Sequence, residues 1–282
     1  MKGKVCVITG ATSGIGLVAA ERLAALGARL VLVGRDERRG KETLANLRAK
    51  VPGVEARVFY GDLSRLSEMK RVGAEIAASE PRIDVLVNNA GAMFTTRQVT
   101  EDGLERTFAL NHMAYFVLSQ TLLPNLKAAA PSRVVSTASD AHRGQQLDFS
   151  DLQAAKSYRG FAVYGRSKLA NILFTRELAR RLAGSGVTAN CLHPGFVATR
   201  FGDNNGGLMR TGISLAKLIA AVKPETGAET IVYLASSPEV ADTSGLYFYK
   251  CRPGTPTAAA QDDGAARRLW EVSENIAGLV SA

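Results

Sequence analysis

Residues 5–16 read VCVITGATSGIG, a short apolar run followed by a turn that contains three glycines. The β-branched and other apolar residues at 5–8 are typical of a buried strand. From Ile15 onward, apolar residues recur at the spacing of a helix face, and Gly27 follows the last of them. A strand, a glycine-rich turn and a helix in this order predict the start of a parallel α/β sheet.

The same alternation of short apolar runs and amphipathic segments continues along the chain. We expect strands at residues 5–8, 30–33, 54–60, 83–87, 133–137, 188–192 and 246–249. We expect helices at residues 15–26, 36–50, 64–79, 101–129 and 161–183, the fourth of them broken near Asn111. Apolar strands that alternate with helices indicate a parallel sheet covered on both faces. The predicted fold class is therefore α/β, a doubly wound (Rossmann) sheet of about seven strands, in one domain spanning residues 1–282.

Composition narrows the class of protein. The chain has 282 residues, of which 46% are hydrophobic and 22% charged, as in ordinary globular proteins. The net charge is +9, but the basic residues are scattered and only 6% of residues are aromatic, so we do not expect a nucleic-acid partner. No apolar run approaches the roughly 20 residues that a membrane helix needs, and no signal peptide fits. We expect no membrane anchor and a cytoplasmic location.

Cysteine and histidine usage points away from disulfides and metals. The three cysteines match no disulfide or metal-site spacing, and Cys6 and Cys191 fall in strand-like runs. Buried free thiols in a reducing compartment are the expected state. The histidines lack metal-ligand spacing, so we predict no metal site and expect structural or solvent-facing roles for His112, His142 and His193.

The glycine-rich turn predicts a dinucleotide site. In an open parallel sheet, ligands bind beyond the carboxyl ends of the strands, where this turn lies. Glycines permit a tight turn and a close approach of the backbone to a pyrophosphate, which the following helix N-terminus attracts. The alternative is a packing turn without a ligand. The candidate contacts in the turn are Gly10, Thr12, Ser13, Gly14, Ile15 and Gly16.

The end of the second strand favours NADP over NAD. An NAD site usually places a carboxylate there to bind the ribose 2′-hydroxyl, but this chain has Gly34 followed by Arg35. An arginine can bind a 2′-phosphate through charge-assisted hydrogen bonds. Asp36 is a candidate cap for the next helix. After the third strand, Asp62 and Leu63 are candidate adenine contacts, with a helix cap as the alternative for Asp62.

Tyr164, Lys168 and Ser139 predict proton transfer at a substrate oxygen. Tyr164 and Lys168 stand four residues apart on an expected helix and so share one face. A nearby ammonium, together with the positively charged nicotinamide ring of a bound cofactor, favours the phenolate, which lets a tyrosine exchange a proton at neutral pH. Ser139 follows the fifth strand and can hydrogen-bond the substrate oxygen. With the dinucleotide site, this set predicts hydride transfer between an alcohol and a carbonyl.

These motifs occur in one order that resembles the short-chain dehydrogenase/reductase family, and the resemblance covers residues 3–278. The matching segments are TGATSGIG at 9–16, NNAG at 88–91, Ser139, YGRSK at 164–168 and HPG at 193–195. Within the family, GRD at 34–36, SDAHR at 139–143 and the tail RLWEVS at 268–273 are similar to the retinol dehydrogenase-type branch. One departure is Ala138 before Ser139, where relatives often have a second serine.

The resemblance implies further site residues. Asn111 would be a fourth catalytic residue that positions a water behind Lys168, although a helix kink or cap also explains it. The resemblance also implies homodimers or homotetramers that pair the helices around Asn111 and Tyr164. The implied cofactor contacts outside the glycine-rich turn are Asn89, Ala90, Gly91, Tyr164, Lys168, Pro194, Gly195, Val197 and Thr199.

The predicted activity is an NADP-dependent oxidoreductase for an alcohol and an aldehyde or ketone, with NAD the less favoured cofactor. Apolar residues within 200–222 predict a lid over a lipophilic substrate, or a segment that only packs on the core. A catalytically idle NADP-sensing protein of the same fold is the main alternative. The absence of a Gly-x-Ser-x-Gly elbow and of a phosphate-binding GxxxxGK[ST] loop argues against a hydrolase and an NTPase.

Overall fold

The computed structural model of this chain describes residues 1–195 and 223–279. Its centre is one sheet of eight strands in the order β3-β2-β1-β4-β5-β6-β7-β8. The first seven are parallel, and β8 pairs antiparallel with β7. The strands are β1 (Val5–Thr9), β2 (Arg29–Gly34), β3 (Ala56–Tyr60), β4 (Val85–Asn88), β5 (Ser132–Thr137), β6 (Val187–His193), β7 (Tyr247–Tyr249) and β8 (Arg252–Pro253).

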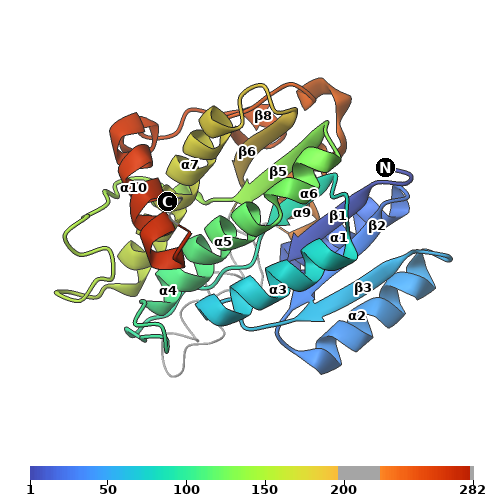
Figure 1. The fold of residues 1–282 in the computed structure, drawn as a ribbon, viewed down its shortest axis with the longest axis horizontal. Coiled ribbons are helices and arrows are strands. Elements are labelled where there is room, and N and C mark those ends of the chain that lie inside the picture. The colour runs from blue at the N-terminus through green and yellow to red at the C-terminus, as the bar shows by residue number, and fades with distance from the viewer. Residues whose placement is uncertain (196–222, 280–282) are drawn as a thin grey trace.

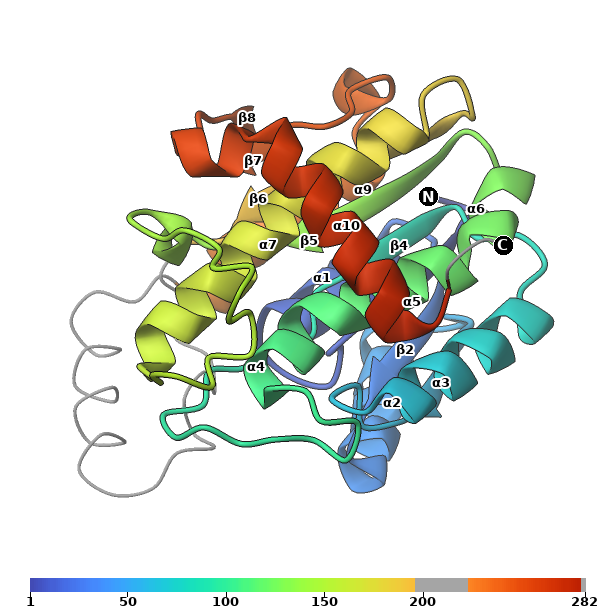
Figure 2. The same ribbon diagram turned by 60° about the vertical axis from the view of Figure 1, so that its left-hand side comes forward.

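Helices cover both faces of the sheet, as Figures 1 and 2 show. The long helices are α1 (Gly14–Ala25), α2 (Glu37–Lys50), α3 (Leu66–Ser79), α5 (Ala114–Thr121), α7 (Gly160–Arg181), α9 (Pro224–Ser236) and α10 (Asp263–Ala277). Shorter elements are α4 (Arg106–Phe108), the π-helix η1 (Ala109–Met113), α6 (Leu123–Ala128) and the 3₁₀ helices η2 (Asp140–His142), η3 (Pro238–Val240) and η4 (Ala258–Gln261).

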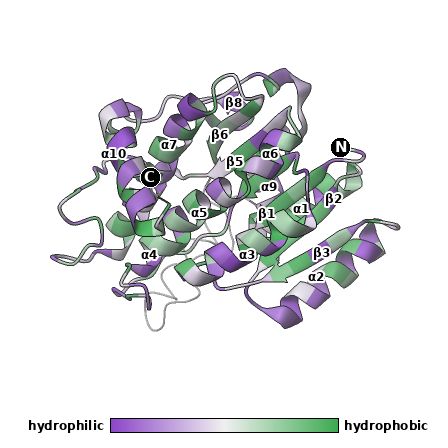
Figure 3. Cartoon of the chain, viewed as in Figure 1, coloured by the Kyte–Doolittle hydropathy of each residue, from purple (hydrophilic) through white to green (hydrophobic). Residues whose placement is uncertain are grey.

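Two hydrophobic clusters fill the space between the sheet and the helices on its two faces. One packs α1 and α9 against the sheet, and the other packs α3, α5, α7 and α10 against its opposite face. Figure 3 shows apolar colour along the strands and polar colour on the outward sides of the helices. From β1 the chain adds β2 and β3 on one side, and it then crosses back to add β4 on the other side of β1. α/β folds bind their ligands at such a switch point, here between β1 and β4.

The predicted fold class is confirmed, and the structure adds detail. Each expected strand is present within two residues of its predicted bounds, and β8 is an additional two-residue edge strand. The expected helix at 101–129 is divided into α4, η1, α5 and α6. The break near Asn111 is the π-helix, in which the backbone bulges by one residue.

Two helices, α9 and α10, were not among the expected elements. The ends of α10 carry the usual signals: the Asp262 carboxylate accepts a hydrogen bond from the Ala265 amide, and Gly278 ends the helix at φ 62°. The helix follows a loop of proline, threonine and alanine residues, and the aromatic partners of Trp270 lie roughly 100 and 150 residues earlier in the chain. Among the described residues, no helix is long and apolar enough to cross a membrane.

α10 lies across α5 and α7 (Figure 2), the helices that the resemblance expects to pair between subunits. Trp270 of α10 stacks on Phe174 with ring centroids 5.9 Å apart and meets the edge of Phe116 at 5.0 Å. The apolar surface of these two helices is thus covered within the same chain. The assembly state stays a prediction.

Candidate active site

The glycine-rich turn connects β1 to α1 at the switch point, and its glycines are needed for contacts within the protein. A Cβ at Gly10 would stand 2.9 Å from the Ala90 Cα, and one at Gly16 would stand 2.5 Å from Asn89 Nδ2. Gly14 has φ 56°, a conformation that other residues rarely adopt. The sequence interpretation assigned these glycines to a ligand, but at least two of them also let the turn pack against residues 89–90.

Asn89 holds the turn in place. Its side chain donates hydrogen bonds to the carbonyl oxygens of Thr9 at 2.9 Å and Gly10 at 3.4 Å. In return, the Thr9 hydroxyl accepts from the amides of Asn89 at 2.9 Å and Ala90 at 3.0 Å. The segments after β1 and β4 are therefore locked together, which places the predicted contacts Asn89, Ala90 and Gly91 beside the glycine-rich turn.

Arg35 is exposed at the end of β2, and no described carboxylate pairs with it. The acidic residue that follows is already occupied: the Asp36 carboxylate accepts from the Arg39 amide at 2.9 Å, which lowers the pKa of Asp36. Arg38 pairs with Glu42 at 2.6 Å. Asp36 thus caps α2 as expected, and Arg35 is left as a cation that can bind an anion beside the turn.

Asp62 closes a turn after β3. Its Oδ1 accepts from the Ser64 amide at 3.0 Å and from the Ser64 hydroxyl at 2.8 Å. α3 begins only at Leu66, with Arg65 at its N-cap, so the alternative that Asp62 caps this helix is wrong. Leu63 is 5% exposed and its side chain belongs to the core, which leaves only its backbone for a ligand contact.

Tyr164, Lys168 and Ser139 come together between α7 and the end of β5. Lys168 is 3% exposed, and its Nζ donates to the carbonyl of Thr137, the last residue of β5, at 2.9 Å. The same ammonium lies 5.6 Å from the centre of the Tyr164 ring. Ser139 lies close enough to the Tyr164 side chain to lower the pKa of the phenol. The structure therefore assembles the three residues that the sequence selected as a proton-transfer set.

Burial dominates the titration of this set. It raises the pKa of Tyr164 to about 12, although the nearby Ser139 acts in the opposite direction. It also lowers the pKa of Lys168 to about 7. The expectation that the lysine makes the tyrosine acidic is therefore not met by these protein groups alone. An ammonium buried without a carboxylate is itself destabilised, and its attraction for a phenolate does not outweigh the desolvation of both groups.

Asn111 lies in the π-helix and is fully buried. Its amide accepts from the Ala92 amide at 2.9 Å and donates to the Ala92 carbonyl and the Ser167 hydroxyl, both at 2.9 Å. A Cβ at Gly91 would stand 3.2 Å from Asn111 Oδ1 and 3.4 Å from Lys168 Nζ. Glycine at this position therefore leaves a narrow space between the asparagine and the lysine.

The segment after β6 is described only in part. The Gly195 amide donates to His193 Nδ1 at 3.1 Å, and the His193 ring stacks on Tyr249 with centroids 4.6 Å apart. Pro194 and Gly195 follow the carboxyl end of β6, on the same edge of the sheet as the glycine-rich turn. Val197, Thr199 and the proposed lid at 200–222 lie outside the described residues.

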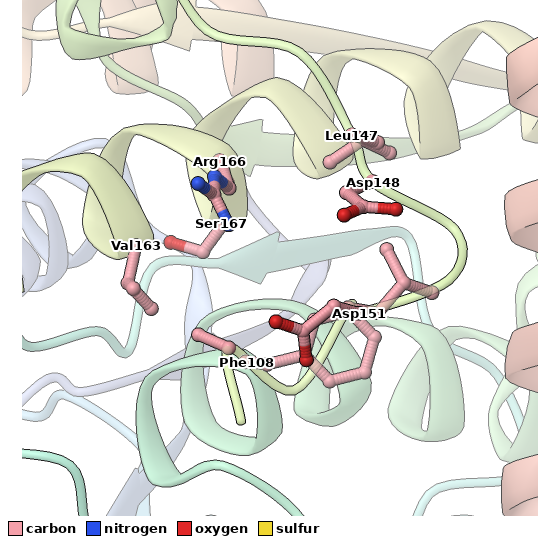
Figure 4. A pocket seen from close by; sticks show the side chains of 9 residues that line it. Phe108, Leu147, Asp148, Asp151, Val163, Arg166 and Ser167 are labelled. Carbon is pink, nitrogen blue, oxygen red and sulfur yellow. The ribbon is translucent and has the colours of Figure 1, made fainter. Parts of the chain in front are cut away.

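A small pocket lies on another side of α7 and holds none of the predicted site residues (Figure 4). Val163, Arg166 and Ser167 face Phe108 and the loop that carries Asp148 and Asp151. The Ser167 hydroxyl connects this pocket to the candidate site, because it accepts a hydrogen bond from Asn111 and donates one to the Tyr164 carbonyl.

His142 was expected to be structural or solvent-facing, and the structure gives it a structural place. It is fully buried, and its Nδ1 lies 2.7 Å from the carbonyl oxygen of Ser139. Its place three residues after Ser139 is the only signal in the sequence that could have suggested this contact. No group of three or more metal-ligating side chains gathers anywhere in residues 1–195 and 223–279.

Comparison with known proteins identifies the family of this chain. The family model for short chain dehydrogenases matches residues 4–206. Human retinol dehydrogenase 14 is 42% identical over 295 residues, covering 99% of this chain and 88% of the relative. Human retinol dehydrogenase 13 is 39% identical over 282 residues, covering 98% and 85%.

Solved structures share the fold. An uncharacterised protein from Mycobacterium paratuberculosis superimposes with a TM-score of 0.79 at 31% identity, covering 98% of this chain and 94% of the other. The NADP complex of RhlG from Pseudomonas aeruginosa gives a TM-score of 0.70 at 27% identity, covering 88% and 94%. Fold, motif order and relatives together show that this chain belongs to the short-chain dehydrogenase/reductase family, and that it is similar to the retinol dehydrogenases within it.

Proposed function

We propose that this protein is an NADP-dependent oxidoreductase that interconverts an alcohol and an aldehyde or ketone. The observation that carries the proposal is the contact of Ser139 with Tyr164 beside a buried Lys168, at the sheet edge where the glycine-rich turn lies. An oxidoreductase acting on alcohols is also what the retinol dehydrogenase relatives support. Because those relatives are named for retinol, a lipophilic substrate is favoured.

The residues present fit a nicotinamide dinucleotide. The Lys168 ammonium has three donors, and among the described residues the Thr137 carbonyl is the one acceptor recorded for it. A buried cation with unfilled donors suits the ribose hydroxyls of such a cofactor. No carboxylate in residues 1–195 and 223–279 pairs with the exposed Arg35, so its guanidinium can bind a 2′-phosphate, which supports NADP over NAD.

When bound, the cofactor would supply or accept the hydride. Tyr164 would exchange a proton with the substrate oxygen, and Ser139 would donate a hydrogen bond to that oxygen as negative charge develops on it. Lys168 would favour a phenolate at Tyr164 through its positive charge. With the positively charged ring of an oxidised nicotinamide beside the pair, the two charges together would offset the burial that raises the pKa of Tyr164. Asn111 would hold the segment at Ala92 and helix α7 at Ser167 in place beside Lys168, through its hydrogen bonds to these two residues.

Two measurements test the proposal. NADPH oxidation with a panel of aldehydes and ketones should show turnover, and Tyr164→Phe should lower kcat by about 10²–10⁴-fold with NADPH affinity unchanged. Arg35→Gln should weaken NADPH binding by about tenfold or more, with little effect on NADH. Tight NADPH binding by the wild-type protein without turnover of any carbonyl would instead favour an NADP-sensing role.

A further inference from the structure

His142 connects the catalytic serine to the C-terminal part of the chain. Ser139 is the N-cap of η2, and its hydroxyl accepts a hydrogen bond from the Ala141 amide at 3.2 Å. His142 is the last residue of η2, and its ring turns back so that Nδ1 lies 2.7 Å from the Ser139 carbonyl oxygen. On the other side of the ring, the Thr257 amide donates to Nε2 at 3.3 Å.

These two contacts fix the tautomer of the ring. A carbonyl oxygen can only accept, so Nδ1 must carry a proton; a backbone amide can only donate, so Nε2 must be unprotonated. Burial lowers the pKa of His142, which keeps the ring neutral. The ring also meets the edge of Tyr247 at 5.4 Å, which restricts its rotation. His142 is therefore held in one orientation from three sides.

The surroundings give η2 little freedom. A Cβ at Gly165, the residue after Tyr164, would stand 2.4 Å from the carbonyl oxygen of Ala141, so η2 packs directly on α7 at the position of the catalytic tyrosine. At this close approach, a small rotation of the Ser139 backbone would change the direction of its hydroxyl toward Tyr164. Catalytic hydrogen bonds need their donors held within about 0.5 Å of the productive position.

We propose that His142 is a positioning residue: its Nδ1–H holds the Ser139 carbonyl and thereby fixes the direction of the Ser139 hydroxyl toward Tyr164. This proposal rests on the proposed oxidoreductase function. It adds a residue that touches neither the substrate oxygen nor Tyr164 but acts through Ser139. It also makes the Thr257 segment part of the site, because that segment sets which nitrogen carries the proton.

Two variants at position 142 separate the two sides of the ring. The amide of His142→Asn ends near the place of Nδ1 and can still donate to the Ser139 carbonyl. The amide of His142→Gln reaches toward Nε2 and retains only the Thr257 side. Each variant loses one of two hydrogen bonds, so under a merely structural role the loss of activity should follow the loss of stability in both variants.

We expect His142→Gln to lower kcat about tenfold, as the loss of about 1.4 kcal/mol from a positioning contact implies, and His142→Asn to stay within about threefold of wild type. The KM for NADPH and its Kd should not change in either variant. His112→Gln, a change at another fully buried histidine, is the matched control for loss of stability alone. Equal kcat values for His142→Asn and His142→Gln would overturn the proposal.

A measurement on the wild-type protein tests the same point if a variant does not fold. Long-range ¹H–¹⁵N NMR correlations distinguish the two neutral tautomers of histidine. We expect His142 with its proton on Nδ1, and a proton on Nε2 would overturn the proposal. If no carbonyl substrate is turned over by wild type, the proposed function fails, while this tautomer measurement still reports on His142 by itself.

Discussion

The methyl group of Thr12 lies over Gly34 at the point where the glycine-rich turn meets the end of β2. A Cβ at position 34 would stand 2.8 Å from Thr12 Cγ2, well inside the usual contact distance of about 3.5 Å between carbon atoms. Thr12 is β-branched, so its side chain has few alternative rotamers. Thr12 therefore occupies the space that an acidic residue at position 34, of the kind that binds the ribose in NAD sites, would need.

This contact predicts that the two positions are coupled in cofactor choice. Gly34→Asp alone should weaken the binding of both NADPH and NADH, because the new side chain displaces Thr12. Adding Thr12→Ala should restore NADH binding, with a coupling free energy of about 1 kcal/mol or more between the two changes. Fluorescence titration of both cofactors against the two single variants and the double variant measures the coupling. If the changes in binding free energy of the two single variants simply add in the double variant, Thr12 does not exclude an acidic side chain from position 34.

The buried His112 predicts loss of stability in mild acid. Burial lowers the pKa of His112 to about 3, and its Nε2 lies 2.8 Å from the Ser273 hydroxyl. An unfolded histidine has a pKa of about 6.5, so below that pH the unfolded chain binds a proton that the folded chain does not. The free energy of unfolding should then fall by up to about 1.4 kcal/mol per pH unit on this account as pH decreases from 6 to 4.

His142 and His193 also have lowered pKa values and act in the same direction, so the contribution of His112 has to be isolated. Urea unfolding of wild type and His112→Gln at pH 7, 6 and 5 does this. The variant should lose clearly less stability than wild type between pH 6 and pH 5. Parallel pH dependences in the two proteins would mean that His112 does not titrate on unfolding.

Trp270 should make α10 a main source of stability. Its side chain is 4% exposed and stacks on Phe174, and the Arg181 guanidinium lies over its ring at 4.4 Å from the centre. Trp270→Ala should lower the free energy of unfolding by about 3–5 kcal/mol, as for other large buried aromatic residues. Phe161, which is 64% exposed, is the matched control, and Phe161→Ala should change stability by less than about 0.5 kcal/mol. Chemical denaturation at one pH compares both variants.

Because Trp270 covers α5 and α7, the same variant also tests assembly. If α5 and α7 pair between subunits, light scattering should give the molar mass of a dimer or tetramer for the wild-type protein and a lower molar mass for Trp270→Ala. If α10 is their permanent cover, Trp270→Ala should instead expose apolar surface and increase association.

The three thiols should react very differently. Cys6 and Cys191 are 0% and 1% exposed, and burial raises the pKa of each thiol to about 12. Cys251 is partly exposed in the turn between β7 and β8. A thiol reagent such as DTNB should modify about one cysteine per folded chain, because only the accessible thiolate reacts. Cys251→Ser should abolish this reaction in the native protein, and rapid labelling of more than one thiol would contradict the assigned burial.

The sequence by itself determined the sheet, the order of the motifs and the identity of Tyr164, Lys168 and Ser139. These depend on local patterns: apolar runs of strand length, glycines at a strand–helix turn, and a four-residue spacing on a helix. Such patterns are readable because neighbouring residues in the chain set backbone conformation and the face on which a side chain lies.

Only the tertiary structure decided which groups meet across the fold. It showed that Asn89 locks the glycine-rich turn, that Thr12 covers Gly34, that His142 holds the Ser139 carbonyl, and that α10 covers α5 and α7. It also showed that burial, and not the lysine charge, sets the pKa of Tyr164 among the protein groups. Contacts and desolvation depend on segments that are distant in sequence, and periodicity along one segment carries no information about the segment packed against it.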